Sequence, residues 1–338
     1  MQNLQKSKET AKKQRENYLD WISGLMILQM IFGHILIFAE LIDKPGWFEA
    51  NHILSFFMPW FFFKSGMFFN SAKSWAETLK SSWKRLMVPF IIFTIIGYFV
   101  QVLWLCLLKP EVNWKWYIGS IKQVFTDGCI ATNGPIWYLL SLFIIRLGYF
   151  QLSKVGVKDS LLLLLSAVIS ISFYLYGLSQ ILLIVVHTVL GMFFFVCGHY
   201  FKIIQFNNKV FFISLTVTIS TVLLHPSHVE MYGGTLEYGN YTLYFAYSLA
   251  AVIVINNLIQ IIPPRMLLKV NLSSIGRNSM SYLVVHFPIL ALCQLFFSFN
   301  PNFSSTYKFL IILIVLTITL PPLKRLLNKE QFKWMVGE

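Results

Sequence analysis

Long apolar runs alternate with short polar segments over almost all of the 338-residue chain. Most runs hold about 17 to 25 residues, the length that a helix needs to cross the hydrocarbon core of a bilayer. Lipid cannot hydrogen-bond to the backbone, so such runs are expected to be α-helices. We therefore predict an all-α, polytopic membrane bundle of ten transmembrane helices, at about 19–40, 52–69, 86–108, 135–153, 160–177, 180–200, 210–225, 241–262, 279–299 and 307–326.

The polar segments between the runs divide the chain only at its two ends. Residues 1–18 form a basic tail, residues 19–326 hold all the apolar runs, and residues 327–338 form a second polar tail. The first run is too long for a signal peptide and has no small-residue cleavage site after it, which indicates a retained anchor. We find no internal repeat or linker, so we predict a single membrane domain between two tails.

Charge places this domain relative to the membrane. The sequence is 57% hydrophobic and 12% charged, with a net charge of +13. Because its basic residues lie in short clusters between apolar runs, they indicate membrane topology and not a nucleic-acid-binding surface. With the N-terminus inside, the inside segments carry 21 Lys and Arg residues and the outside loops carry 5. This asymmetry predicts an even number of spans and two cytoplasmic termini.

Two of the expected outside loops are long. The loop at 109–134 carries Trp114, Trp116 and Tyr117, which are either interfacial aromatics or a platform for stacking a sugar. The loop at 226–240 follows His225 and carries His228 and Glu230, but this spacing is a weak metal pattern. The four cysteines show no metal-ligand spacing either, so we predict no bound metal.

The first apolar run carries three polar groups on one helical face. Asp20, Ser23 and His34 align at about 100° per residue, and His34 lies roughly 21 Å along the helix from Asp20. A histidine at that depth of a bilayer indicates a functional site, although a hydrogen bond to a neighbouring helix would also explain it. A neutral imidazole can take the proton of an alcohol that attacks a thioester, which favours a catalytic role.

Other polar residues within or beside the runs are candidates for binding. Lys64 interrupts the second run and either extends to the cytoplasmic interface or binds an anionic ligand there. Arg85 precedes the third run, where it is either a topological anchor or a phosphate ligand. His286 lies deep in the ninth run, where it either lines a cavity or satisfies a contact within the bundle.

Five segments together resemble the acyltransferase 3 family of integral-membrane O-acyltransferases. The first is the Asp-x-x-x-Gly…Gly-His pattern of Asp20, Gly24, Gly33 and His34. The others follow in the family's order: MPWFFFKSGMFF at 58–69, KRLMVPF at 84–90, PIWYLLSLFI at 135–144 and IGRNSMSYLVVHFPI at 275–289. The chain departs from the family at Ser23, where a basic residue is frequent, and at Phe57, where a histidine is frequent.

The resemblance implies an enzyme that transfers an acyl group, usually acetyl from acetyl-CoA, to a hydroxyl of a surface polysaccharide, a lipid-linked sugar or a related acceptor. It implies His34 as general base together with Asp20. Lys64, Arg85 and Ser23 would bind the acyl donor, and the acceptor would be bound by Trp137, Tyr138, His286 and Asn278. The family also implies a bacterial inner-membrane location and no metal cofactor.

Two other functions are compatible with these residues. Ten spans with buried histidines and an intramembrane lysine would also suit a transporter or flippase of a lipid-linked glycan. A family member that had lost catalysis through Ser23 could act as a binding subunit instead. The sequence leaves the acceptor and the oligomeric state open.

Overall fold

Helices make up 83% of the computed structural model, and the part of the chain that it describes contains no strand. The described residues are 2–109, 113–176, 182–201, 208–224, 241–263 and 272–337. The predicted all-α membrane bundle is therefore confirmed. The loop at 226–240, with His225 before it and His228 and Glu230 within it, lies outside the described residues.

Most of each of the ten apolar runs lies in one α-helix: α1 (Gln2–Phe38), α3 (Phe57–Met67), α5 (Val88–Leu108), α7 (Trp137–Lys154), α8 (Asp159–Leu175), α9 (Leu183–Phe201), α10 (Asn208–Leu224), α11 (Tyr241–Ile261), α14 (Ser279–Phe299) and α15 (Ser305–Leu327). Among the described residues, seven helical segments are long and apolar enough to cross a membrane. The helices α3, α8 and α10 are shorter, at 11, 17 and 17 residues. The count of ten spans and the location of the termini stay predictions.

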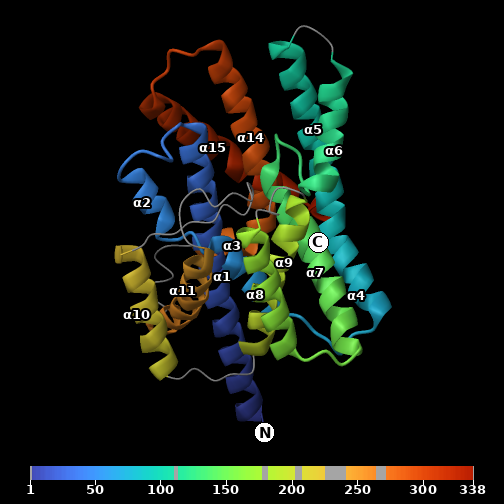
Figure 1. The fold of residues 1–338 in the computed structure, drawn as a ribbon, viewed down its shortest axis with the longest axis vertical. Coiled ribbons are helices and arrows are strands. Elements are labelled where there is room, and N and C mark those ends of the chain that lie inside the picture. The colour runs from blue at the N-terminus through green and yellow to red at the C-terminus, as the bar shows by residue number, and fades with distance from the viewer. Residues whose placement is uncertain are drawn as a thin grey trace.

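Shorter elements join these helices: α2 (Trp47–His52), α4 (Trp75–Ser82), the π-helix η1 (Trp83–Met87), α6 (Trp114–Thr126), the 3-10 helix η2 (Gly134–Ile136), α13 (Leu272–Arg277) and the 3-10 helix η4 (Lys333–Val336). The elements α4, η1 and α5 follow one another without a break, and Figure 1 shows them as one long column.

The long helix α1 organises the bundle (Figure 1). It contacts α3, α11, α13, α14 and α15, and it buries Ile22, Met26 and Leu36 completely. Its closest neighbour is α13, because glycines face the contact: a Cβ atom on Gly276 would lie 1.7 Å from the backbone oxygen of Asp20. Only glycine permits this approach, which brings the two backbones together beside Asp20, the first polar residue of the apolar run at 19–40.

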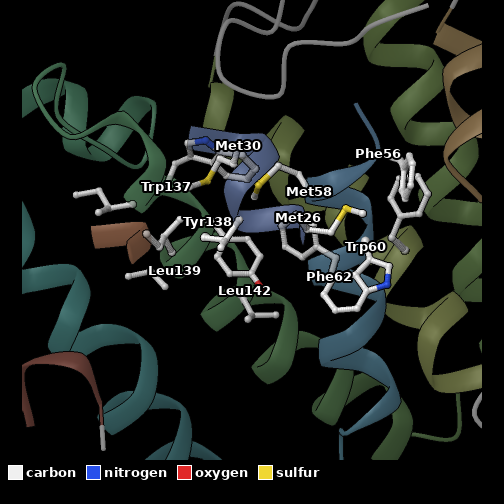
Figure 2. Close-up of a cluster of buried hydrophobic side chains, with 14 of the residues drawn as sticks. Met26, Met30, Phe56, Met58, Trp60, Phe62, Trp137, Tyr138, Leu139 and Leu142 are labelled. Atoms are coloured by element: carbon white, nitrogen blue, oxygen red, sulfur yellow. The ribbon is translucent and has the colours of Figure 1, made fainter. Parts of the chain in front are cut away.

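A cluster of large apolar side chains fills the space between α1, α3 and α7. Figure 2 shows the thioethers of Met26 and Met30 from α1 and Met58 from α3 beside aromatic rings of α3 and α7. Flexible methionines fill irregular gaps that branched side chains would leave empty. The buried members drawn in the figure include Phe62, Trp60, Trp137, Tyr138, Leu139 and Leu142.

The segment at 109–134 is not the simple outside loop that we expected. Its residues 114–126 form α6, whose apolar side chains recur every three or four residues and leave Trp114 and Phe125 72% and 76% exposed. The chain then turns into the protein, where Cys129, Ile130 and Asn133 are fully buried. We did not predict this helix, because the aromatic residues of the segment were considered only as interfacial aromatics or as a platform for stacking a sugar. Both interpretations of Trp114, Trp116 and Tyr117 and the outside location of the segment stay predictions.

The buried segment at 127–136 is held between α5 and α14. The amide of Asn133 donates hydrogen bonds to the backbone oxygens of Phe93 (3.2 Å) and Val284 (3.3 Å), and the Thr132 hydroxyl donates to the oxygen of Gly97 (2.6 Å). Irregular backbone at membrane depth is tolerated only when it is surrounded by protein or lines a cavity. Here, protein surrounds it.

Candidate functional site

A pocket of about 410 Å³ opens between α1, α3, α7 and α14 and the turn that contains η1. Four basic side chains reach it: Lys64 from α3, Lys73 from the segment before α4, Arg85 from η1 and Arg146 from α7. Its remaining lining mixes polar and apolar side chains and consists of Ile27, Met58, Phe61, Ser65, Phe68, Phe69, Asn70, Thr78, Leu86, Tyr138, Leu142, Ser279, Met280 and Leu283.

Only one of the four basic groups, Lys64, has a carboxylate within ion-pair distance in the described ranges. Lys73, Arg85 and Arg146 have none there. The Arg146 guanidinium lies over the ring of Phe69 at 5.8 Å, and its Nε atom is buried without a hydrogen-bond partner in the same ranges. Uncompensated positive charge in a partly enclosed pocket favours an anionic ligand.

The local sequence explains how the two arginines reach the pocket. Arg85 lies in η1, a single π-helical turn between α4 and α5, and such turns frequently occur at functional sites. On α7, Tyr138, Leu142 and Arg146 are spaced at four-residue intervals, so they share one face of the helix. All three line the pocket.

Lys64 connects the pocket to α1. Its ammonium donates to the Ser23 hydroxyl at 2.5 Å and lies 3.7 Å from a carboxylate oxygen of Asp20. The ring of Trp60 lies 5.4 Å below the same ammonium. A cation thus stands beside Ser23, although it comes from α3 and not from α1.

The two histidines singled out in the sequence meet between α1 and α14. The Nδ1 atom of His34 lies 3.0 Å from the Nε2 atom of His286, and the His286 Nδ1 atom lies 2.8 Å from the backbone oxygen of Tyr282. The His286 residue is fully buried, whereas His34 is partly exposed. The edge of Phe287 meets the His34 ring at 5.1 Å between centroids.

The predicted site residues therefore fall into two connected groups. Lys64, Arg85 and Tyr138 line the pocket, with Asp20 and Ser23 bound to Lys64. The histidine pair lies farther along α1 and α14. Ile27 of the pocket precedes His34 by seven residues and Leu283 precedes His286 by three, distances of roughly 10 Å and 5 Å along a helix.

The two remaining predicted residues lie beside the pocket and do not line it. Trp137 is 4% exposed and packs against the buried His187, with 4.3 Å between ring centroids. The amide of Asn278 donates to the oxygen of Ser274 (2.6 Å) and its oxygen accepts from Asn328 (2.5 Å), so it joins the start of α14 to the end of α15.

Sequence reasoning missed Arg146, Lys73 and Ser65 as pocket residues. We had assigned Arg146 to membrane topology, because it lies near the expected cytoplasmic end of its run. Its eight-residue spacing from Tyr138 would have indicated a shared helical face. No comparable pattern marks Lys73 or Ser65, because the fold of the chain around α3 and α4 brings them to the pocket.

Nowhere in the described residues do three or more His, Cys, Asp or Glu side chains gather as they would around a metal ion.

Comparison with known proteins gives one match. The family model of an acyltransferase domain matches residues 16–323, a range that includes the basic pocket and both histidines. No curated protein and no solved structure matches the chain.

Proposed function

Because the chain belongs to the acyltransferase 3 family, we propose that it is a membrane O-acyltransferase that uses acyl-CoA as donor. The transferred group is acetyl, and the acceptor is a hydroxyl of a surface glycan or a lipid-linked sugar. His34 acts as general base. The protein works in a bacterial inner membrane, with the donor entering from the cytoplasm.

One observation carries this proposal: the helices α1 and α14 line the basic pocket and also carry the histidine pair. Coenzyme A carries phosphates at one end and the reactive thioester at the other. Lys64, Arg85 and Arg146 supply the charge-assisted hydrogen bonds that phosphates require, and arginine matches phosphate oxygens in a bidentate manner. Lys73, which is exposed at the pocket rim, adds a fourth positive charge.

Ile27, Met280 and Leu283 line the pocket from the same two helices that carry His34 and His286. Along both helices, the chain direction leads from these residues to the histidines. A donor with its phosphates among the basic groups would extend its acyl arm in this direction. The roughly 10 Å of α1 between Ile27 and His34 is within the reach of such an arm.

The departure at Ser23 does not remove positive charge from this level of α1. The Lys64 ammonium contacts the Ser23 hydroxyl, so a basic group is present there. We propose that Lys64, held by Ser23 and Asp20, takes part in donor binding in place of a basic residue on α1. This supports an active enzyme over a family member without catalysis.

The residues predicted to bind the acceptor lie at or beside the pocket. Tyr138 reaches the pocket, and its hydroxyl lies 3.3 Å from that of Ser65. We propose that Tyr138 contacts the acceptor near the acyl group and that Trp137 and Asn278 shape the surrounding wall.

The test uses membrane vesicles from cells that make the protein, which contain its own acceptor. Vesicles are given labelled acetyl-CoA, and their glycans and lipid-linked sugars are analysed by mass spectrometry with and without the gene. We expect gene-dependent label and the added mass of one acetyl group on a glycan. Unlabelled glycans that accumulate on one side of the membrane without the gene would favour a flippase instead.

A further inference from the structure

The hydrogen bonds around the two histidines determine where their protons lie. We propose that His286 is a positioning residue that holds His34 in the tautomer protonated at Nδ1, which leaves the His34 Nε2 atom as the proton acceptor. This inference rests on the proposed function and assigns the reacting atom within it. The inference rests on the geometry of three groups that follow one another in a chain of hydrogen bonds: the backbone oxygen of Tyr282, the side chain of His286 and the side chain of His34.

The first step concerns His286 and its own helix. Its Nδ1 atom lies 2.8 Å from the backbone oxygen of Tyr282, one turn earlier on α14. A carbonyl oxygen only accepts hydrogen bonds, so His286 must carry a proton on Nδ1. The Nε2 atom of a neutral His286 is therefore an acceptor.

The second step follows for His34. Its Nδ1 atom lies 3.0 Å from this acceptor, so the proton between the two rings belongs to His34 Nδ1. A neutral imidazole carries one N–H, so the Nε2 atom of His34 keeps its lone pair. In a histidine, the hydrogen bond of one ring nitrogen sets the state of the other.

Burial assigns different roles to the two rings. His286 is 0% exposed, with one ring nitrogen facing Tyr282 and the other facing His34. His34 keeps part of its surface accessible, and Phe287 supports its ring from the edge. A substrate can therefore reach His34, whereas His286 acts only through His34.

This arrangement supplies a balanced proton path. The acceptor hydroxyl gives its proton to His34 Nε2 while its oxygen bonds to the thioester carbonyl carbon. The carbon–sulfur bond then breaks, and the proton passes from Nε2 to the departing sulfur, which yields the ester and the coenzyme A thiol. While His34 is charged, its Nδ1–H donates to His286 Nε2, which stabilises the charge.

The first test reads the proton positions directly. The protein is labelled with ¹⁵N-histidine in nanodiscs, and the His34 resonances are assigned by their absence in His34→Gln. We expect wild-type His34 to be protonated at Nδ1 and not at Nε2. In His286→Leu, which offers no acceptor, we expect the proton to move mainly to Nε2. A neutral wild-type His34 protonated at Nε2 would overturn the inference.

The second test measures acetyl transfer in the vesicle assay. His286→Leu should lower kcat by about 10²-fold or more, since a general base in the wrong tautomer loses most of its effect. The KM for acetyl-CoA should stay near the wild-type value. His286→Gln, whose amide oxygen can accept from His34 Nδ1–H, should recover a large part of kcat. A merely structural His286 would give equal losses in both variants.

Controls separate this inference from the proposed function. His187→Gln is the matched control, because His187 is also buried on a transmembrane helix but does not contact His34; it should leave kcat unchanged. If His34→Gln is fully active, the proposed function fails. If His34→Gln is inactive but His286→Leu keeps full kcat, only the inference fails. If His286→Leu does not fold, the NMR spectrum of the wild-type protein and the kcat of His286→Gln still test the inference.

Discussion

The basic pocket and the histidine pair differ in how far their polar groups are compensated by neighbouring groups. In the pocket, Arg85 and Arg146 have no described carboxylate within ion-pair distance, and Lys64 shares its charge with Asp20 at 3.7 Å. In the pair, hydrogen bonds at both His286 nitrogens and at His34 Nδ1 leave His34 Nε2 as the one ring nitrogen without a partner among the described residues. Positive charges without an ion-pair partner favour the binding of an anionic ligand, whereas hydrogen bonds at three of the four ring nitrogens fix the position of a proton.

The same two helices hold both regions in place. Helices α1 and α14 contribute Ile27 and Leu283 to the pocket and His34 and His286 to the pair. The comparison therefore predicts that the two regions respond differently to mutation: changes in the pocket should affect donor affinity, and changes in the pair should affect the chemical step.

The largest effect is expected at His34. His34→Gln should lower kcat for acetyl transfer by roughly 10²- to 10⁴-fold, because glutamine cannot take a proton near neutral pH. Binding of acetyl-CoA, measured by calorimetry in detergent, should persist. Loss of donor binding together with kcat would break the comparison, because it would place His34 within the donor site.

The next largest effect is expected in the pocket. Arg85→Ala and Arg146→Ala should each raise the KM for acetyl-CoA about tenfold, since a charge-assisted hydrogen bond contributes about 1.5 to 3 kcal/mol. Lys84→Ala is the matched control, because the exposed Lys84 neighbours Arg85 but does not line the pocket. Equal changes in Arg85→Ala and Lys84→Ala would return Arg85 to a topological role.

A third change tests the close packing of α13 against α1, the helix that contributes to both regions. Gly276→Ala should lower the free energy of unfolding by about 1 to 3 kcal/mol, the usual cost of overpacking, because the added Cβ would meet the backbone oxygen of Asp20. Gly119→Ala on α6 is the control, with no atom within 4 Å of its added Cβ. Thermal unfolding in detergent measures both. Equal stability of the two variants would show that α1 and α13 can separate freely.

The smallest effect is expected at the other end of α1. Lys308 and Glu40 form an ion pair at 2.5 Å there, away from the pocket, with the Glu40 side chain 68% exposed. Glu40→Gln should cost at most about 1 kcal/mol of stability and leave the donor KM unchanged. A raised KM would show that the lysine–carboxylate pairs at both ends of the first apolar run influence the donor, and the comparison would need a third region.

Sequence patterns predicted the helices well because hydropathy is a local property. Every expected run contains a helix, and the run at 279–299 matches α14 at both ends. The functional residues were harder to group, since His34 and His286 are 252 positions apart and nothing local pairs them. Their polarity at bilayer depth indicated function, but only the packing of α14 against α1 shows that they meet.

Patterns of charge were less informative than patterns of hydropathy. We assigned Arg146 to membrane topology because it lies near the expected cytoplasmic end of its run. A basic residue at that position can be a topological anchor or can line a pocket, and the distribution of charge does not distinguish the two. The helix α6 within the expected loop at 109–134 was missed for a related reason. At 13 residues it is too short to resemble a membrane span, and the buried turn that follows it contains no apolar run. Tertiary packing decides both cases.

The buried turn at 127–136 also bears on how the protein is assembled. The amide of Asn133 is satisfied in part by Val284, which is synthesised 151 residues later. Until α14 emerges from the ribosome and inserts, this backbone lacks one of the neighbours that shields it from lipid. Biogenesis must therefore hold the region around α6 and α7 in a provisional arrangement, and the arrival of α14 completes the wall of the site and delivers His286 in the same event.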